Sequence, residues 1–129
     1  MTAKHFLSRG FWLKKRIDKK VEQRDALYYR LTNTSPNYEG DGTQSTKDPH
    51  KFDGLAELDD EIQRMKDDLN DILLEILEVI SHVENEKARD VLRSYYHDML
   101  TWDKVAERCQ ISKAVAVIIR DKATKDIKL

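Results

Sequence analysis

The chain has 129 residues, 36% of them charged, and its formal net charge of −1 conceals a strong asymmetry along the sequence. Nine Lys and Arg stand against three Asp and Glu in residues 1–30, six against sixteen in residues 31–90, and eight against five in residues 91–129, so the segments carry net charges of +6, −10 and +3. A single cysteine, Cys109, excludes an internal disulfide framework, and no apolar run approaches the roughly 20 residues of a membrane-spanning helix.

The first predicted element is a helix over residues 3–31. Its apolar residues recur at helical spacing along one stripe, which Gly10 and Arg24 interrupt. A helix with an interrupted stripe depends on a partner for its stability. Because residues 1–30 are basic and the following segment is acidic, we predict that Arg24 meets an acidic residue of the second helix. The stripe consists of Phe6, Leu13, Ile17, Val21, Tyr28 and Leu31.

Residues 32–54 form the predicted connection to the next helix. This stretch contains both prolines, Pro36 and Pro49, together with Asn, Ser, Thr, Asp and Gly, and it has no hydrophobic period. So long a connection without secondary structure is uncommon in a compact domain and is usually either mobile or functional. We predict a flexible loop and leave a contact role as the alternative.

The clearest period in the chain predicts a second long helix over residues 55–83. Its apolar residues alternate in steps of three and four across four heptads, the pattern of a coiled-coil seam. The acidic residues between them lie off the seam, where we expect a solvated face. Two helices of similar length joined by a loop indicate an antiparallel hairpin. The seam consists of Leu55, Leu58, Ile62, Met65, Leu69, Ile72, Ile76, Val79 and Val83, and Leu73, Leu77 and Ile80 widen it.

A third helix is predicted over Glu86 to Met99, with Asn85 as the residue at its start. Two shorter helices follow, each preceded by a hydroxyl residue that can accept a hydrogen bond from the first turn: Thr101 and Ser112. Helix, tight turn and helix in this order form a helix-turn-helix, whose second helix usually enters the major groove of DNA. The apolar residues of these helices are Val105, Ala106 and Cys109 before the turn, Ile111 in it, and Ala116, Ile119 and Ala123 after it.

The turn contains Gln110 where glycine is common, so a left-handed backbone there is expected to cost about 1 kcal/mol. These elements together predict an all-α protein, with a long antiparallel helical hairpin followed by a C-terminal helix-turn-helix unit of about three helices. The predicted domains are the hairpin over residues 1–84 and the helix-turn-helix over residues 85–129.

The C-terminal stretch also carries a family pattern, formed by Leu92, Arg93, Tyr95, Tyr96, Thr101, Trp102, Val105, Ala106, Ile111, Ser112 and Ala123. In these residues it resembles region 4 of bacterial sigma factors, and more closely the small sigma-like regulators of phages and prophages. Those regulators also join two long helices through a polar loop before the C-terminal unit. The resemblance implies a transcriptional regulator of phage or prophage genes in the cytoplasm of a bacterial host. It would bind double-stranded promoter DNA, alone or with host RNA polymerase.

The last helix would supply most of the DNA contacts. Ser112 and the first turn would anchor a phosphate, basic residues on the flanks would position the backbone, and Val117 and Ile118 would touch thymine methyl groups. Asp121 would repel phosphate unless it accepts a hydrogen bond from a cytosine amino group. The predicted DNA-binding residues are Thr101, Lys104, Ser112, Lys113, Ala114, Val117, Ile118, Arg120, Asp121 and Lys122.

The outer face of this helix departs from the family pattern because it is largely aliphatic, where related recognition helices place hydroxyl, Arg, Lys or Tyr residues. A second interpretation follows, in which Ala114, Val117 and Ile118 are buried against a protein. The chain would then be an assembly or packaging component of a phage, or a homodimer formed through the hairpin or the last helix. The sequence has no catalytic motif, no shared spacing among its four histidines and Cys109, and no cofactor motif, so we expect neither an enzyme nor a metal site.

Overall fold

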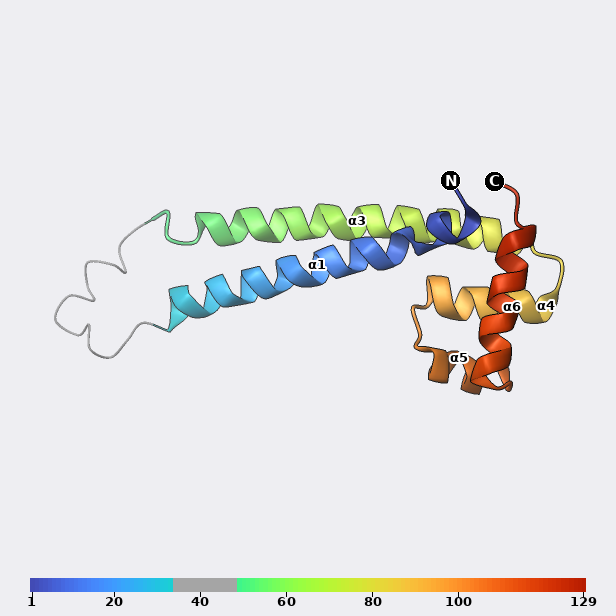
Figure 1. The fold of residues 1–129 in the computed structure, drawn as a ribbon. Helices are drawn as coiled ribbons and strands as arrows, with labels where there is room; N and C mark the ends of the chain where they lie inside the picture. Colours follow the sequence, from blue (N-terminus) through green and yellow to red (C-terminus); the bar gives the residue numbers. More distant parts are fainter. Residues whose placement is uncertain (34–48) are drawn as a thin grey trace. The chain divides into compact units, whose positions relative to one another are not determined.

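A computed structural model describes residues 1–33 and 49–129, and all of the regular structure in these ranges is helical. Figure 1 shows the long helices α1 (Ala3–Thr32) and α3 (Asp53–Ser81), followed by the shorter helices of the C-terminal part. These observations confirm the all-α class, with a hairpin followed by C-terminal helices. The predicted flexibility of the 32–54 connection concerns mainly residues 34–48, which lie outside the described ranges. The remaining elements are α4 (Glu86–Leu92), the π-helix η2 (Arg93–His97), α5 (Trp102–Cys109) and α6 (Lys113–Asp126).

The chain forms two compact units whose boundaries fall inside the long helices. One unit consists of residues 1–14 and 68–129, and the other of residues 15–67. The units therefore divide at residues 14/15 and 67/68 rather than after residue 84. The start of α1 and the end of α3 belong with the C-terminal helices, so the three together form the unit that carries the helix-turn-helix.

In the unit of residues 15–67 the two helices pair in antiparallel order. Lys20 forms an ion pair with Glu61 at 3.1 Å, and the Arg24 guanidinium donates to Asp59 at 2.8 Å, so the numbering rises on α1 as it falls on α3. This contact confirms the prediction that Arg24 meets an acidic residue of the second helix. The apolar seam between these helices buries Ile17, Leu55 and Ile62.

The core of the other unit forms where α1 and α3 meet the C-terminal helices. Leu7, Ile76 and Leu92 are fully buried there, and Tyr96 is 1% exposed. Gly10 lies beside them, and a Cβ added to it would stand only 3.1 Å from the Met99 side chain. A glycine at this position therefore lets α1 approach its neighbours closely, which explains the interruption of its apolar stripe.

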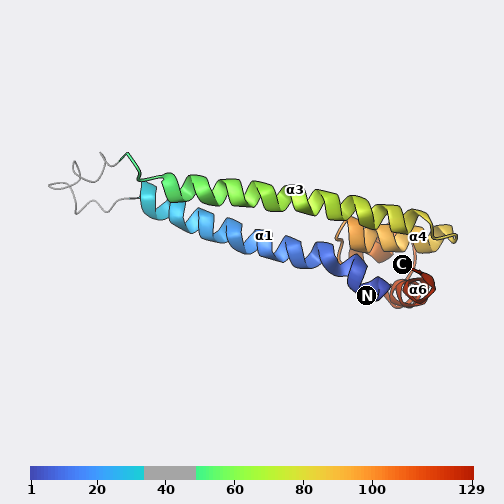
Figure 2. The same cartoon turned by 90° about the horizontal axis from the view of Figure 1, so that it is seen from above.

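The helix-turn-helix has its own small core. Val91, Val105 and Ala116 are fully buried and Cys109 nearly so, with the turn residue Ile111 packed against them. In Figure 2 helix α6 is seen end-on while α4 runs across the view, so α6 lies crosswise to α4. Small side chains on the inner face of α6 permit this close crossing. The core positions predicted from the helical spacing of Val105, Cys109 and Ala116 are confirmed.

The predicted helix over residues 86–99 is not uniform. It is α-helical to Leu92 and then widens into η2, where the backbone N–H of Asp98 donates to the carbonyl of Arg93. A π-turn inserts an extra residue into the turn, and here both Ser94 and Tyr96 reach the interior. The predicted segment ends at Met99, whose φ of 57° was not expected from the sequence.

Gln110 adopts the left-handed conformation expected for the turn, with φ 58° and ψ 44°. Replacing it with glycine removes the steric cost of a Cβ in this region, so Gln110→Gly should raise the free energy of unfolding by about 0.5–1 kcal/mol. Gln110→Ala keeps the Cβ and serves as the control. Chemical denaturation of the three proteins measures the difference, and a glycine variant no more stable than the alanine variant would contradict strain at this position.

Candidate nucleic-acid interface

The interface begins at the two capped helix starts of the helix-turn-helix. The Ser112 hydroxyl accepts from the backbone N–H of Val115 at 3.2 Å, and the Thr101 hydroxyl accepts from that of Lys104 at 3.4 Å. Both predicted caps are therefore formed. Each cap fixes where its helix begins, and the first N–H groups of the helix point outward with partial positive charge.

The outer face of α6 is aliphatic and open to solvent. Ile118 is 63% exposed and Val115 is 42% exposed, and Ala114 on the same helix is also exposed. Val117, predicted to lie on this face, is half-buried, and Val115 joins the face although it was not among the predicted DNA-binding residues. The face therefore consists of Ala114, Val115 and Ile118, with Val117 at its edge.

Lysines surround this aliphatic face. Lys104, Lys122 and Lys125 are exposed, and within the described part of the chain none of them forms an ion pair. Lys113 lies 3.3 Å from Asp103, but both side chains are largely exposed, at 62% and 81%. A pair this exposed contributes little to stability and exchanges readily for another anion. Four lysines are thus available to contact a polyanion.

Arg120 does not lie on an exposed flank, where the sequence analysis placed it. Its side chain is only 19% exposed, and its Nε donates to Asp121 at 2.7 Å. The guanidinium lies over the ring of Trp102, 5.0 Å from the centroid, and 5.5 Å from that of Tyr95. The guanidinium is therefore occupied by partners within the fold, and its predicted phosphate contact remains a prediction.

Asp121 is 43% exposed and is paired with two cations of the protein. Lys4 of α1 contacts its carboxylate at 3.0 Å, on the same oxygen that Arg120 contacts. Hydrogen bonds from Lys4 and then from Arg120 lower the pKa of Asp121 and outweigh the opposing effect of burial. With two cations beside it, this carboxylate repels a nearby phosphate far less than an isolated aspartate would.

A second acidic residue, Asp98, directly follows η2 and links it to α5 by contacting Arg108. Burial opposes ionisation of its carboxyl group, but hydrogen bonds from His97 and Arg108 outweigh burial and lower its pKa. Arg108 also donates to the buried hydroxyl of Ser94 at 3.5 Å. The cluster fixes the start of the helix-turn-helix against the preceding π-helix.

A pH dependence follows from this lowered pKa. A carboxyl group with a depressed pKa stabilises the folded state above its unfolded pKa of about 3.9, and that stability is lost as the pH falls through the folded pKa. Asp98→Asn should therefore cost on the order of 1 kcal/mol at pH 7, and the difference from wild type should shrink below about pH 4. Thermal melts of both proteins from pH 3 to pH 7 measure it. A constant difference over that range would contradict the assignment.

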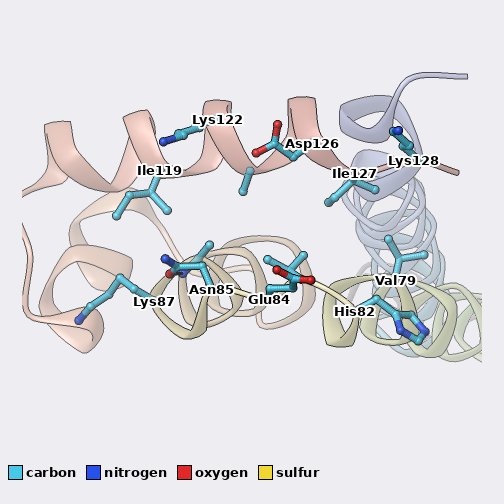
Figure 3. Close-up of a pocket in the computed structure, with 13 residues that line it drawn as sticks. Val79, His82, Glu84, Asn85, Lys87, Ile119, Lys122, Asp126, Ile127 and Lys128 are labelled. Carbon is cyan, nitrogen blue, oxygen red and sulfur yellow. Dashed lines mark hydrogen bonds between the residues drawn. The ribbon is translucent and has the colours of Figure 1, made fainter.

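A groove of about 940 Å³ lies beside α6. It is lined by residues of α6, of α4 and of the end of α3. Figure 3 shows Ile119 and Ile127 pointing from the α6 side toward α4 and the end of α3. Lys122 lines this groove, so it stands between the groove and the aliphatic outer face. Lys87 on the opposite wall is held by the carbonyl of Cys109 at 2.9 Å. The charged lining residues include both signs: Glu84, Lys87, Lys122, Asp126 and Lys128.

Neither a metal site nor a membrane-spanning helix is found in residues 1–33 and 49–129. No group of three or more His, Cys, Asp or Glu side chains in these ranges is arranged to hold a metal ion. Among the same residues, no helix combines the length and the apolar character that crossing a bilayer requires. Many of the acidic residues of α3 are exposed, and three of its acidic residues, Asp59, Glu61 and Glu75, pair with α1.

Comparison with known proteins places the chain in a family without adding a function. No curated protein and no solved structure matches the sequence. One protein-family profile does match, over residues 32–128, a range that covers the whole of α3 and all of the C-terminal helices. By that match the chain belongs to the family described as "Protein of unknown function (DUF1492)".

Proposed function

We propose that the protein is a sequence-specific DNA-binding transcriptional regulator that places the outer face of α6 in the major groove. The observation that carries the proposal is the division of α6 into two sides. Ala116, Ile119 and Ala123 pack inward, while Ala114, Val115 and Ile118 face solvent behind the Ser112 cap. A helix presented in this way, after a short helix and a left-handed turn, has the geometry of a recognition helix.

The side chains on this surface indicate how the protein would recognise a DNA sequence. Lys104, Lys113, Lys122 and Lys125 would contact phosphates and set the position of α6 on the duplex. Ala114, Val115 and Ile118 would contact thymine methyl groups, which aliphatic side chains recognise. Such contacts discriminate less than bidentate hydrogen bonds, so we expect a preference for T-containing steps within a site also selected by its shape.

The resemblance to sigma region 4 supports phage or prophage promoters as the targets and host RNA polymerase as a partner in the bacterial cytoplasm. Under this proposal the C-terminal helices bind DNA, and Thr101 and Ser112 fix the starts of the two helices that approach it. The protein is proposed to act by binding alone, without catalysis and without a cofactor.

The salt dependence of DNA binding tests the proposal. Lys113→Ala and Lys122→Ala should each weaken binding similarly on all duplexes and reduce the slope of log K against log salt by about one. Fluorescence anisotropy with a labelled promoter duplex and a random duplex measures both quantities. Lys66→Ala, which removes an exposed lysine of α3, is the matched control and should change neither. Slopes that stay unchanged in both α6 variants would exclude phosphate contact by this face.

The same aliphatic face favours one other function. Exposed apolar side chains grouped on a helix also mark protein interfaces, and Ile118 and Val115 are among the most exposed large apolar residues of the C-terminal helices. In that case α6 would bind a second copy of the chain or a component of a phage assembly. Binding that is insensitive to salt, with no retention of DNA, would favour this alternative.

A further inference from the structure

Arg120 is the basic residue of α6 whose surroundings differ most from those of its neighbours. Its side chain is 19% exposed, whereas that of Lys113 on the same helix is 62% exposed. A largely enclosed guanidinium has to be compensated by polar partners and by packing. Both are present here, and they come from η2, α5 and α6 itself.

The packing partners are aromatic rings on η2 and α5. Tyr95 and Trp102 stack with their centroids 3.9 Å apart and their planes 17° apart, and the Arg120 guanidinium lies within 5.5 Å of both centroids. Phe11 of α1 meets the Tyr95 ring edge-on at 5.0 Å. A planar cation over aromatic faces is an arrangement that arginine makes better than lysine.

The polar partners hold the two ends of the guanidinium. Nε donates to Asp121 at 2.7 Å, and a terminal nitrogen donates to the Tyr96 hydroxyl at 3.5 Å. Asp121 in turn binds Lys4 at the start of α1. The backbone carbonyl of Arg120 accepts from the buried Thr124 hydroxyl at 2.9 Å, so the α6 turn that carries Arg120 is also fixed.

We propose that Arg120 is a positioning residue that locks α6 in the rotation that presents Ala114, Val115 and Ile118, and that it makes no phosphate contact itself. The inner face of α6 consists mainly of small residues, Ala116 and Ala123, which allow close approach but offer little resistance to rotation. Arg120 supplies that resistance by linking α6 to η2 and α5, and its partner Asp121 adds a contact with Lys4 of α1. The part of this inference that concerns DNA rests on the proposed function.

The test compares Arg120→Lys with Arg93→Lys, which makes the same change at an exposed arginine of η2. All variants are made in a Trp12→Phe background, so that Trp102 is the one remaining tryptophan of the two in the chain. Arg120→Lys should shift the Trp102 emission and speed amide exchange in α6. It should also lower the ratio of promoter to random-duplex affinity by about tenfold, the discrimination carried by roughly one base pair. The salt slope should stay unchanged, and Arg93→Lys should leave Trp102 emission and discrimination as in the parent.

Each of the other outcomes would contradict a particular part of the proposal. A salt slope lower by about one with unchanged discrimination would mean that Arg120 contacts phosphate. Unchanged Trp102 emission and amide exchange would remove the positioning role, whether or not the protein binds DNA. A parent protein that binds no DNA would overturn the proposed function, and the emission and exchange would still decide whether Arg120 holds α6. Should Arg120→Lys fail to fold, Tyr96→Phe removes only one hydroxyl partner and is judged by the same measurements.

Discussion

Ile76→Ala is expected to cause the largest loss of stability among alanine substitutions in α3. The Ile76 side chain is fully buried, beside Gly10 of α1 and within the cluster that contains Leu7, Leu92 and Tyr96. Truncation to alanine leaves a cavity that these packed neighbours fill only in part, so the free energy of unfolding should fall by about 2–5 kcal/mol. Because this cluster joins α1 and α3 to the C-terminal helices, one substitution on the hairpin should destabilise the whole unit.

Leu74→Ala is the matched control, because Leu74 is 65% exposed on the same helix, two residues away. Its loss should be within about 0.5 kcal/mol, as for an ordinary surface substitution. Chemical denaturation followed by circular dichroism measures both variants. Equal losses for Leu74→Ala and Ile76→Ala would show that α3 does not present Ile76 to this core.

Ile118→Asp is expected to abolish DNA binding, with a loss of at least about 100-fold in affinity, while the protein stays folded. Ile118 is 63% exposed, so a carboxylate there remains solvated in the free protein. In a major groove the same carboxylate would lose an apolar contact and face the phosphates. A loss of about 2.7 kcal/mol in binding free energy, the equivalent of that factor, is reasonable for an unpaired charge in an interface.

Leu74→Asp makes the same change at nearly the same exposure on α3 and should leave DNA binding intact. Anisotropy titrations at fixed salt measure both variants, and a thermal melt establishes that each is folded. Sedimentation of the wild type and of Ile118→Asp separates the two candidate functions. A dimer that dissociates with this substitution, in a protein that never binds DNA, would favour the protein interface.

Most of the fold could be predicted from the sequence because the strongest local signals agree with the packing. The seam from Leu55 to Val83 predicted a helix over residues 55–83, and α3 runs over Asp53–Ser81. The hydroxyls of Thr101 and Ser112 marked the starts of α5 and α6, and both form the expected cap hydrogen bonds. The charge asymmetry between the first two segments predicted the contact of Arg24 with α3. Hydrophobic periodicity and helix caps involve residues that are close in the sequence, so they can be recognised from the sequence alone.

Contacts between segments that are distant in the sequence could not be predicted in the same way. Leu7 is fully buried, although the predicted stripe of α1 did not include it, because the C-terminal helices cover a second face of α1. Arg120 was expected on a flank of the last helix, where it would contact the DNA backbone. The rings of Tyr95 and Trp102 and the carboxylate of Asp121 enclose it instead. The π-turn at Arg93–His97 follows from packing of Ser94 and Tyr96, for which the sequence has no known signal.

Methyl NMR spectra recorded while a promoter duplex is added test most directly whether the outer face of α6 meets DNA. The methyl resonances of Ala114, Val115 and Ile118 should shift most, and those of Leu55 and Ile62, buried in the unit of residues 15–67, should stay in place. The shifts should shrink as the salt concentration rises, because counterion release drives the association. Bound DNA that leaves the three α6 methyl groups unperturbed, or a duplex that does not bind at low salt, would contradict the account.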